Sequence, residues 1–135
     1  MPFVDTSALI ALADRSDGHH KKAATYLGSI PTTKGKLVTT DYILDETFTR
    51  LRFTIGLPGT VRFGEAIMRS ALYTIVQVDG RVRREAWEWF KRYQDKDFSF
   101  TDCTSFVVMR ALQLEEAFAF DEHFVQAGFL RVPQP

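Results

Sequence analysis

The sequence predicts an α/β protein, a three-layer α/β/α domain with a five-stranded, mostly parallel sheet. Short apolar runs alternate with longer amphipathic segments along residues 1–135, as is typical of a sheet covered by helices on both faces. Turn residues separate these segments, and no composition shift divides the chain, so we expect a single domain. The expected strands are 2–4, 36–40, 73–78, 117–120 and 129–132, and the expected helices are 8–13, 19–30, 42–55, 59–70, 81–93 and 101–112.

The composition limits the classes of function. Hydrophobic residues make up 45% and charged residues 25%, which is ordinary for a globular domain and excludes a disordered chain. Lys and Arg number 17, as do Asp and Glu, so nucleic acid would have to bind to a local basic patch rather than to a global positive field. Cys103 is the only cysteine, and no signal-type or bilayer-length apolar run is present. We therefore expect a cytoplasmic protein that does not associate with membranes.

The first expected strand, residues 2–4, ends at a carboxylate. Asp5 follows it, and Thr6 and Ser7 lead into the helix expected at 8–13. Ligands of open α/β sheets bind beyond the carboxyl ends of the strands, so Asp5 is placed to point into a crevice. Asp is also a favoured helix N-cap residue, which is the alternative role. If Asp5 serves a site, capping is expected to fall to Thr6 and Ser7.

The second strand also runs into an acidic helix start. Asp41 follows the strand at 36–40 and is expected to cap the helix at 42–55. Asp45 and Glu46 lie in the first turns of this helix, and only one of them can aim at the crevice. Acids at such positions also stabilise a helix by about 0.3–1 kcal/mol through its dipole, without any catalytic role.

The helix expected at 81–93 has one apolar and one basic face. Trp87 fits neither face clearly. The basic face favours simple solvation, with contact to a partner or to nucleic acid left open. The residues expected to face inward are Val82, Ala86, Trp89, Phe90 and Tyr93, and those expected to face outward are Arg83, Arg84, Lys91 and Arg92.

Two further acids complete the pattern near the C-terminus. Thr101 is the expected N-cap of the helix at 101–112, which puts Asp102 in its first turn and Ser105 near the same crevice edge. The apolar run that follows ends at Asp121, the second strand to end at a carboxylate. His123 is expected on the surface of a short helical turn.

These acids predict a metal-dependent hydrolytic site. Right-handed crossovers bring all strand-to-helix loops to one sheet edge, so four acids distant in sequence can converge. Carboxylates so close raise one another's pKa values unless cations bind among them. Oxygen ligands select hard ions such as Mg²⁺ or Mn²⁺, which activate water against phosphodiesters. The acids concerned are Asp5, Glu46, Asp102 and Asp121.

Four motifs along the chain resemble those of PIN-domain ribonucleases, and in particular of the compact VapC-type toxins of toxin–antitoxin pairs. They are VDTSAL at 4–9, ILDET at 43–47, FTD at 100–102 and FAFD at 118–121. The resemblance implies an endoribonuclease with a five-stranded parallel sheet and a tendency to form homodimers. It also implies a small antitoxin protein that plugs the acidic site.

The resemblance assigns roles to individual residues. Ser7 matches a hydroxyl that supports the first aspartate, and together with Arg15 it is expected to contact the RNA substrate. Asp97 is a peripheral candidate. The residues that match the catalytic and metal-binding quartet are Asp5, Glu46, Asp102 and Asp121.

Other functions of the same sheet class are weaker. A phosphotransfer receiver would need paired acids after its first strand, but Thr6 follows Asp5. A haloacid-dehalogenase-type phosphatase would need a second aspartate at the position of Ser7. A stand-alone PIN nuclease of RNA processing remains an open alternative. So does a non-catalytic PIN module that binds RNA or protein, although the complete quartet argues against it.

Overall fold

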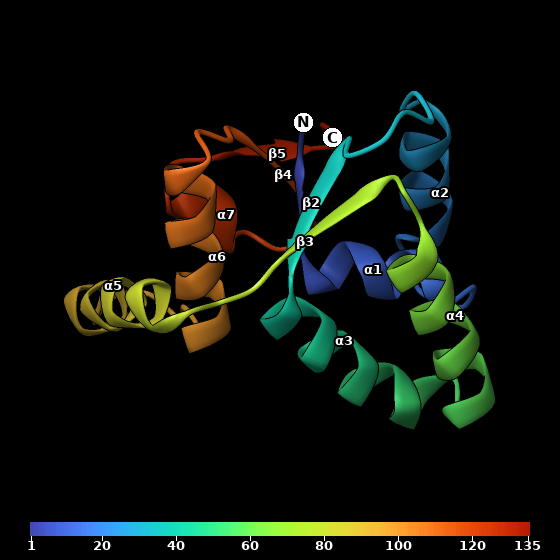
Figure 1. Cartoon of the computed structure of the whole chain (residues 1–135), viewed down its shortest axis with the longest axis horizontal. Helices are drawn as coiled ribbons and strands as arrows, with labels where there is room; N and C mark the ends of the chain where they lie inside the picture. The colour runs from blue at the N-terminus through green and yellow to red at the C-terminus, as the bar shows by residue number, and fades with distance from the viewer.

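A five-stranded sheet forms the centre of the computed structural model, which describes residues 1–135 (Figure 1). All four strand pairs are parallel, so the predicted mostly parallel sheet is parallel throughout. The strand order is β3-β2-β1-β4-β5. The strands are β1 (Phe3–Val4), β2 (Leu37–Thr40), β3 (Tyr73–Val76), β4 (Glu116–Phe118) and β5 (Leu130–Val132).

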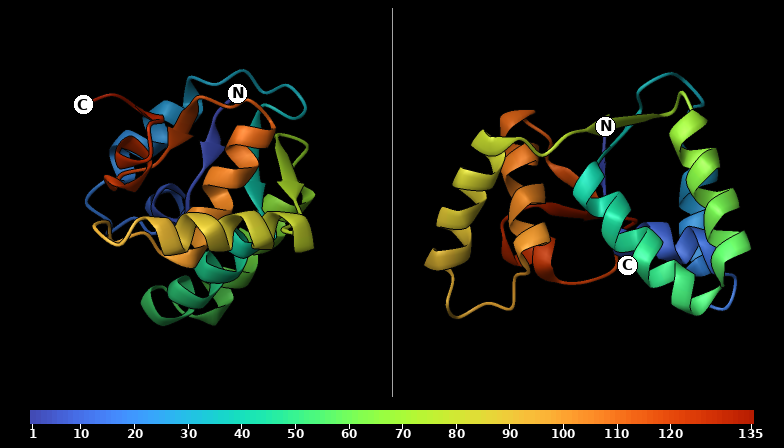
Figure 2. Two further views of the ribbon diagram at one scale, coloured as in Figure 1. Left: turned by 90° about the vertical axis from the view of Figure 1, so that its left-hand side faces the viewer. Right: turned by 60° about the horizontal axis from the view of Figure 1, so that its bottom comes forward.

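Seven helices surround this sheet, and the predicted three-layer fold is confirmed. Helices α1, α2 and α4 lie on one side of the sheet and α5, α6 and α7 on the other, while α3 runs from the carboxyl edge of β2 (Figures 1 and 2). None of the helices combines the length and hydropathy that crossing a bilayer requires. The helices are α1 (Thr6–Ala13), α2 (His20–Gly28), α3 (Asp41–Thr54), α4 (Leu57–Arg69), α5 (Gly80–Arg92), α6 (Phe100–Ala111) and α7 (His123–Gln126).

The central position of β1 explains why distant loops meet. Phe3 pairs with Val38 of β2 on one side and with Ala117 of β4 on the other. Because the three strands are parallel, the loops that leave β1, β2 and β4 emerge side by side at one edge. These loops lead into α1, α3 and α7. Asp5 and Asp121 lie in the loops after β1 and β4, and Glu46 lies in α3, which follows β2.

The predicted N-caps of α3 and α6 are wrong. The hydroxyl of Thr40, the last residue of β2, accepts from Ile43 N at 3.1 Å and caps α3. Asp41 instead accepts from Val78 N at 2.8 Å, which ties α3 to the segment after β3. Ser99, not Thr101, caps α6. In both cases the residue with extended backbone just before the helix becomes the cap, because a cap needs non-helical dihedrals.

Aromatic packing fixes α6 and α7 against the sheet. Phe106 of α6 meets Phe124 of α7 edge to face, with ring centroids 5.2 Å apart, and Phe124 contacts Phe3 of β1 at 6.1 Å. All three rings are fully buried. Edge-to-face pairs stabilise such contacts by about 0.5–1.5 kcal/mol beyond the burial of their area. These contacts pack the middle of α6 and the first turn of α7 against β1.

Candidate active site

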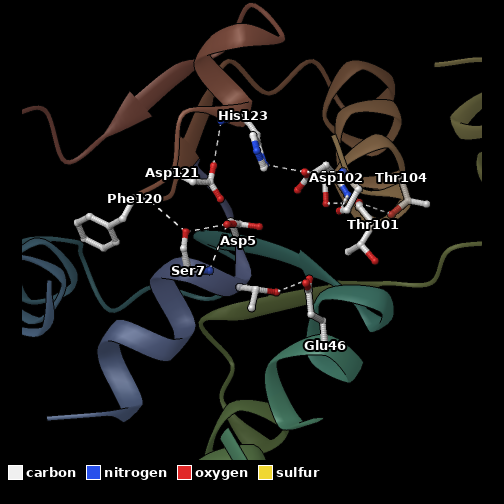
Figure 3. A network of polar contacts seen from close by, with 12 residues as sticks. Asp5, Ser7, Glu46, Thr101, Asp102, Thr104, Phe120, Asp121 and His123 are labelled. Atoms are coloured by element: carbon white, nitrogen blue, oxygen red, sulfur yellow. Dashed lines mark hydrogen bonds and ion pairs between the residues drawn. The ribbon is translucent and has the colours of Figure 1, made fainter. Parts of the chain in front are cut away.

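A small polar pocket lies at the carboxyl edge of the sheet, and all four predicted acids line it. Its volume is about 150 Å³, and no apolar residue lines it. The four carboxylates come from the segments after β1, β2 and β4 and from the start of α6, and they point toward a common space (Figure 3). The lining residues are Asp5, Thr6, Ser7, Glu46, Arg50, Ser99, Asp102, Asp121 and His123.

Asp5 is buried at the bottom of the pocket and also caps α1. Its Oδ2 accepts from Ser7 N at 3.1 Å and from Ser7 Oγ at 2.7 Å, so the expectation that Thr6 and Ser7 provide the cap is wrong. Both bonds use one oxygen and leave Oδ1 free. Burial, with the nearby charges of Asp121 and Asp102, raises the pKa of Asp5 to about 7, although the hydrogen bonds from Ser7 lower it.

Ser7 joins two segments that are far apart in the sequence. Its Oγ donates to Asp5 and accepts from Phe120 N at 3.0 Å, after β4. The hydroxyl therefore orients Asp5 and holds the loop that carries Asp121. Its predicted contact with substrate remains a prediction.

Asp102 is held by two donors on one oxygen. Its Oδ2 accepts from Ser99 N at 3.0 Å, while Asp102 N donates to Ser99 Oγ at 2.9 Å, which forms a capping box. Nδ1 of His123 lies 2.8 Å from the same Oδ2, an ion pair when the imidazole is protonated. Burial raises the pKa of Asp102, against the lowering effects of the Ser99 N–H and of His123.

His123 was missed as a site residue, because its expected position was the helix surface. The structure places it in the pocket lining and in contact with Asp102. Its position two residues after Asp121, in a loop at the same sheet edge, is the sequence signal that could have identified it.

Glu46 rather than Asp45 faces the pocket. Its Oε2 accepts from Thr6 Oγ1 at 3.1 Å, which links α3 to the start of α1, while Asp45 is exposed. Arg50 lies one helical turn beyond Glu46 and also lines the pocket. Thr6, Arg50 and Ser99 are the other lining residues that the sequence analysis missed.

Asp121 lies farther from its strand than expected. β4 ends at Phe118, three residues before Asp121. Ala119 N makes one more bond toward β5, to Val132 O at 3.2 Å. Phe120 N then leaves the sheet and donates to Ser7 Oγ. Oδ1 of Asp121 accepts from His123 N at 3.1 Å. Among the neighbouring charges, Asp121 has the largest raising effect on the pKa of Asp5, so the two carboxylates are electrostatically coupled.

Three other candidates lie outside the pocket. Arg15 is exposed in the turn after α1, and Asp97 is exposed before α6. Ser105 is fully buried and donates to Thr101 O at 3.1 Å, so its expected place at the crevice edge is wrong. It is one turn too far along α6 to reach the pocket.

The donor set fits a hard divalent cation. The pocket offers carboxylate and hydroxyl oxygens. Burial first, and the neighbouring carboxylates second, raise the pKa values of Asp5 and Asp102, and a bound cation would favour their ionised forms. No three acidic, histidine or cysteine side chains are close enough to bind one ion directly together. Mg²⁺ commonly uses one or two carboxylates and keeps several waters, so this spacing fits an ion held partly through water.

Comparisons with known proteins agree with this geometry. The sequence model of the PIN domain family matches residues 3–130. The 23S rRNA-specific endonuclease VapC20 of Mycobacterium tuberculosis (strain H37Rv) is 36% identical over 132 residues, which cover 98% of each chain. A VapC ribonuclease of Archaeoglobus fulgidus is 34% identical over 124 residues, 90% of this chain and 78% of that protein.

Two solved structures share the fold. The crystal structure of M. tuberculosis VapC20, described as a sarcin-ricin loop cleaving toxin, superposes with a TM-score of 0.89 at 35% identity and covers 96% of this chain and 97% of its own. FitAcB from Neisseria gonorrhoeae gives a TM-score of 0.73 at 13% identity, with coverage of 97% and 96%. At that identity the second structure supports the fold alone.

Proposed function

Since the chain belongs to the PIN domain family, we propose that it is a metal-dependent endoribonuclease and the toxin of a toxin–antitoxin pair. One observation carries the catalytic part of this proposal. Four acids from separate segments line one polar pocket, and the two most buried of them, Asp5 and Asp102, have raised pKa values. Such a pocket is suited to a cation and an RNA phosphate.

Three of the four acids are held in place by neighbouring residues. Ser7 orients Asp5, Ser99 and His123 orient Asp102, and Thr6 holds Glu46. Asp5 and Asp102 would hold the ion, and Glu46 and Asp121 would complete the site or orient water. When bound, Mg²⁺ or Mn²⁺ would supply Lewis-acid activation of a water and of the scissile phosphate. Arg50 lies at the pocket and is placed to pair with a neighbouring phosphate.

The names of the relatives support the choice of substrate and partner. VapC20 is named for 23S rRNA and described as cleaving the sarcin-ricin loop, so a structured ribosomal RNA loop is the first substrate to test. The proposed partner is a small antitoxin protein that covers the acidic pocket. A homodimeric state and a cytoplasmic location are also proposed.

A cleavage assay tests the catalytic proposal. Wild-type protein with Mg²⁺ or Mn²⁺ should cut a synthetic sarcin-ricin hairpin or a panel of structured RNAs, and chelator should stop the reaction. Asp5→Asn and Asp102→Asn should abolish cleavage. Asp45→Asn is the matched control, because Asp45 is an exposed acid next to Glu46. Cleavage that survives chelator or either pocket variant would contradict the proposal.

The toxin proposal has its own test. Expression of the wild-type chain should arrest growth, and co-expression of the protein encoded by a small neighbouring gene should relieve the arrest. Harmless expression together with active cleavage in vitro would favour a stand-alone nuclease.

A further inference from the structure

A surface of exposed aromatic and arginine side chains lies beside the acidic pocket. Trp87 and Phe90 of α5 are 51% and 41% exposed, and both pack against Phe100 at the start of α6. The ring centroids are 5.7 to 6.1 Å apart. Phe90 was expected to face inward, so that expectation is wrong. We call this surface, with Arg83 and Arg84, the aromatic–arginine patch.

The two arginines of the patch converge without an acidic partner. A methyl group placed on Gly80 would lie 3.3 Å from Nη1 of Arg84 and 3.7 Å from Nη2 of Arg83, so both guanidinium groups lie over the same residue. Neither forms an ion pair, although Nη1 of Arg83 donates to Val78 O at 2.9 Å. Two adjacent positive charges repel each other, and an anion between them relieves that repulsion.

The acids of α5 are engaged elsewhere. Glu85 pairs with Arg81 at 3.3 Å, and Glu88 pairs with Lys91 at 3.2 Å. Glu88 also lines a hollow of about 500 Å³ in the patch, together with Arg83, Arg84 and Trp87. Its charge is balanced by Lys91, so the uncompensated charge of the hollow is positive.

The patch and the acidic pocket share the first turn of α6. Ser99 lines the pocket, and Phe100, the next residue, lines the hollow. Asp102 lies two residues further on and returns to the pocket. A nucleic-acid strand that leaves the pocket across this turn would therefore reach the patch within a few nucleotides.

We propose that the aromatic–arginine patch binds unpaired nucleotides of the RNA substrate that flank the cleaved bond. Bases stack on Trp87 and Phe90, and Arg83 and Arg84 pair with phosphates. Exposed aromatic rings interleaved with guanidinium groups are the usual means of binding single-stranded RNA. The uncompensated arginines favour a polyanion over a protein partner. The inference rests on the proposed endoribonuclease function, since it assigns a substrate subsite to that pocket.

Binding measured without cleavage tests the patch. The affinity of the full chain for a fluorescein-labelled single-stranded RNA oligonucleotide is measured by anisotropy in EDTA. Trp87→Ala should weaken binding about 5- to 140-fold, because stacking of one base contributes about 1–3 kcal/mol. Trp87→Phe should retain most of the affinity. Phe53→Ala is the matched control, because Phe53 is 80% exposed on α3 and lies outside the patch.

The salt dependence tests the arginines. Arg84→Gln should weaken binding and lower the slope of log affinity against log salt by about 0.7, the value for one phosphate contact on a single strand. Arg69→Gln removes an exposed arginine of α4 and should leave the slope unchanged. Wild-type affinity and slope in both Trp87→Ala and Arg84→Gln would overturn the proposal. So would a change of oligomeric state in Trp87→Ala with unchanged RNA binding, which would make the patch a contact between copies.

A parallel cleavage assay separates the two proposals. If the wild-type chain cuts RNA and the patch variants cut it with unchanged KM, the patch proposal fails and the nuclease proposal stands. If the wild-type chain binds RNA through the patch but never cuts it with Mg²⁺ or Mn²⁺, the nuclease proposal fails and the patch is supported as an RNA-binding surface.

Discussion

Nδ1 of His123 lies 2.8 Å from Oδ2 of Asp102, and this contact joins the loop after β4 to the first turn of α6. The same oxygen accepts from Ser99 N, so Oδ1 of Asp102 is left for other partners. His123 therefore orients a proposed metal ligand from a separate element, the start of α7. Partners of this kind fix the geometry of a ligand and tune its affinity for metal.

Loss of His123 should weaken metal use more than it weakens folding. We expect His123→Ala to lower cleavage activity or metal affinity about 10- to 100-fold, the usual effect of removing a group that orients a metal ligand. Titration of activity with Mg²⁺ measures this effect. His123→Asn, which can still donate a hydrogen bond, should recover part of the loss. An unchanged Mg²⁺ dependence in His123→Ala would show that Ser99 alone positions Asp102.

Loss of the Ser7 hydroxyl should affect both stability and the pH profile. Ser7→Ala leaves Phe120 N without its acceptor, so we expect a decrease of about 1–3 kcal/mol in the free energy of unfolding. The Ser7 bonds lower the pKa of Asp5, so that pKa should rise and the pH–rate profile should move to higher pH. Urea unfolding and initial rates between pH 5 and 9 measure the two effects.

Ser16→Ala is the matched control for this variant. The hydroxyl of Ser16 donates to Asp14 at 2.6 Å in the same local geometry, but in an exposed turn. Its removal should change stability by no more than about 0.5 kcal/mol. Equal losses in the two variants would show that the bond to Phe120 contributes nothing.

Without metal, stability should fall as the pH rises toward 7. The pKa of Asp5 is about 7 in the folded chain and near its ordinary value of 3.8 when unfolded. Between these values the folded state binds more protons, so the contribution of Asp5 is fully present below pH 3.8 and is lost as the pH rises to about 7. The loss is on the order of a few kcal/mol. Urea unfolding in EDTA at pH 5 and pH 7.5 measures it.

The difference in the free energy of unfolding between pH 5 and pH 7.5 should shrink in Asp5→Asn, because Asn cannot ionise. It should also shrink in wild-type protein with Mg²⁺, because the cation stabilises the ionised carboxylate. Asp45→Asn should behave as the wild-type chain does, because Asp45 is exposed and does not line the pocket. An equal pH dependence in Asp5→Asn would assign the effect to other groups.

Arg50 should matter more for RNA binding than Arg15. Arg50 lines the acidic pocket, whereas Arg15, the arginine expected from the sequence, lies in an exposed turn outside it. We expect Arg50→Gln to raise KM for RNA about 5- to 50-fold, as loss of a charge-assisted phosphate contact does, and Arg15→Gln to leave it nearly unchanged. Steady-state cleavage kinetics measure both. A larger effect of Arg15→Gln would restore the sequence-based assignment.

The fold and the four acids could be predicted because each depends on local pattern. Apolar runs that end at Asp5 and near Asp121 mark strand ends, and the parallel arrangement brings such ends to one edge whatever their distance in sequence. Glu46 and Asp102 follow from their places in the first turns of helices. The structure confirms that all four line one pocket.

The groups that position these acids could not be predicted, because each contact joins separate elements. The bond from Phe120 to Ser7 spans 113 residues, and the bond from Thr6 to Glu46 spans 40. The choice of Ser99 over Thr101 as the cap depended on where the backbone became helical, and the exposure of Phe90 depended on how α5 packs against α6.

The sequence by itself therefore determined the architecture and the acidic character of the site, since both depend on local features of the chain. These features are the periodicity of apolar residues and the acidic residues that follow the strands. Only the tertiary structure decided which side chains hold Asp5 and Asp102, that Arg50 rather than Arg15 lines the pocket, and that aromatic rings remain exposed beside it. The physical reason is that such contacts depend on the distance and angle between packed elements, which side-chain packing across the whole core sets.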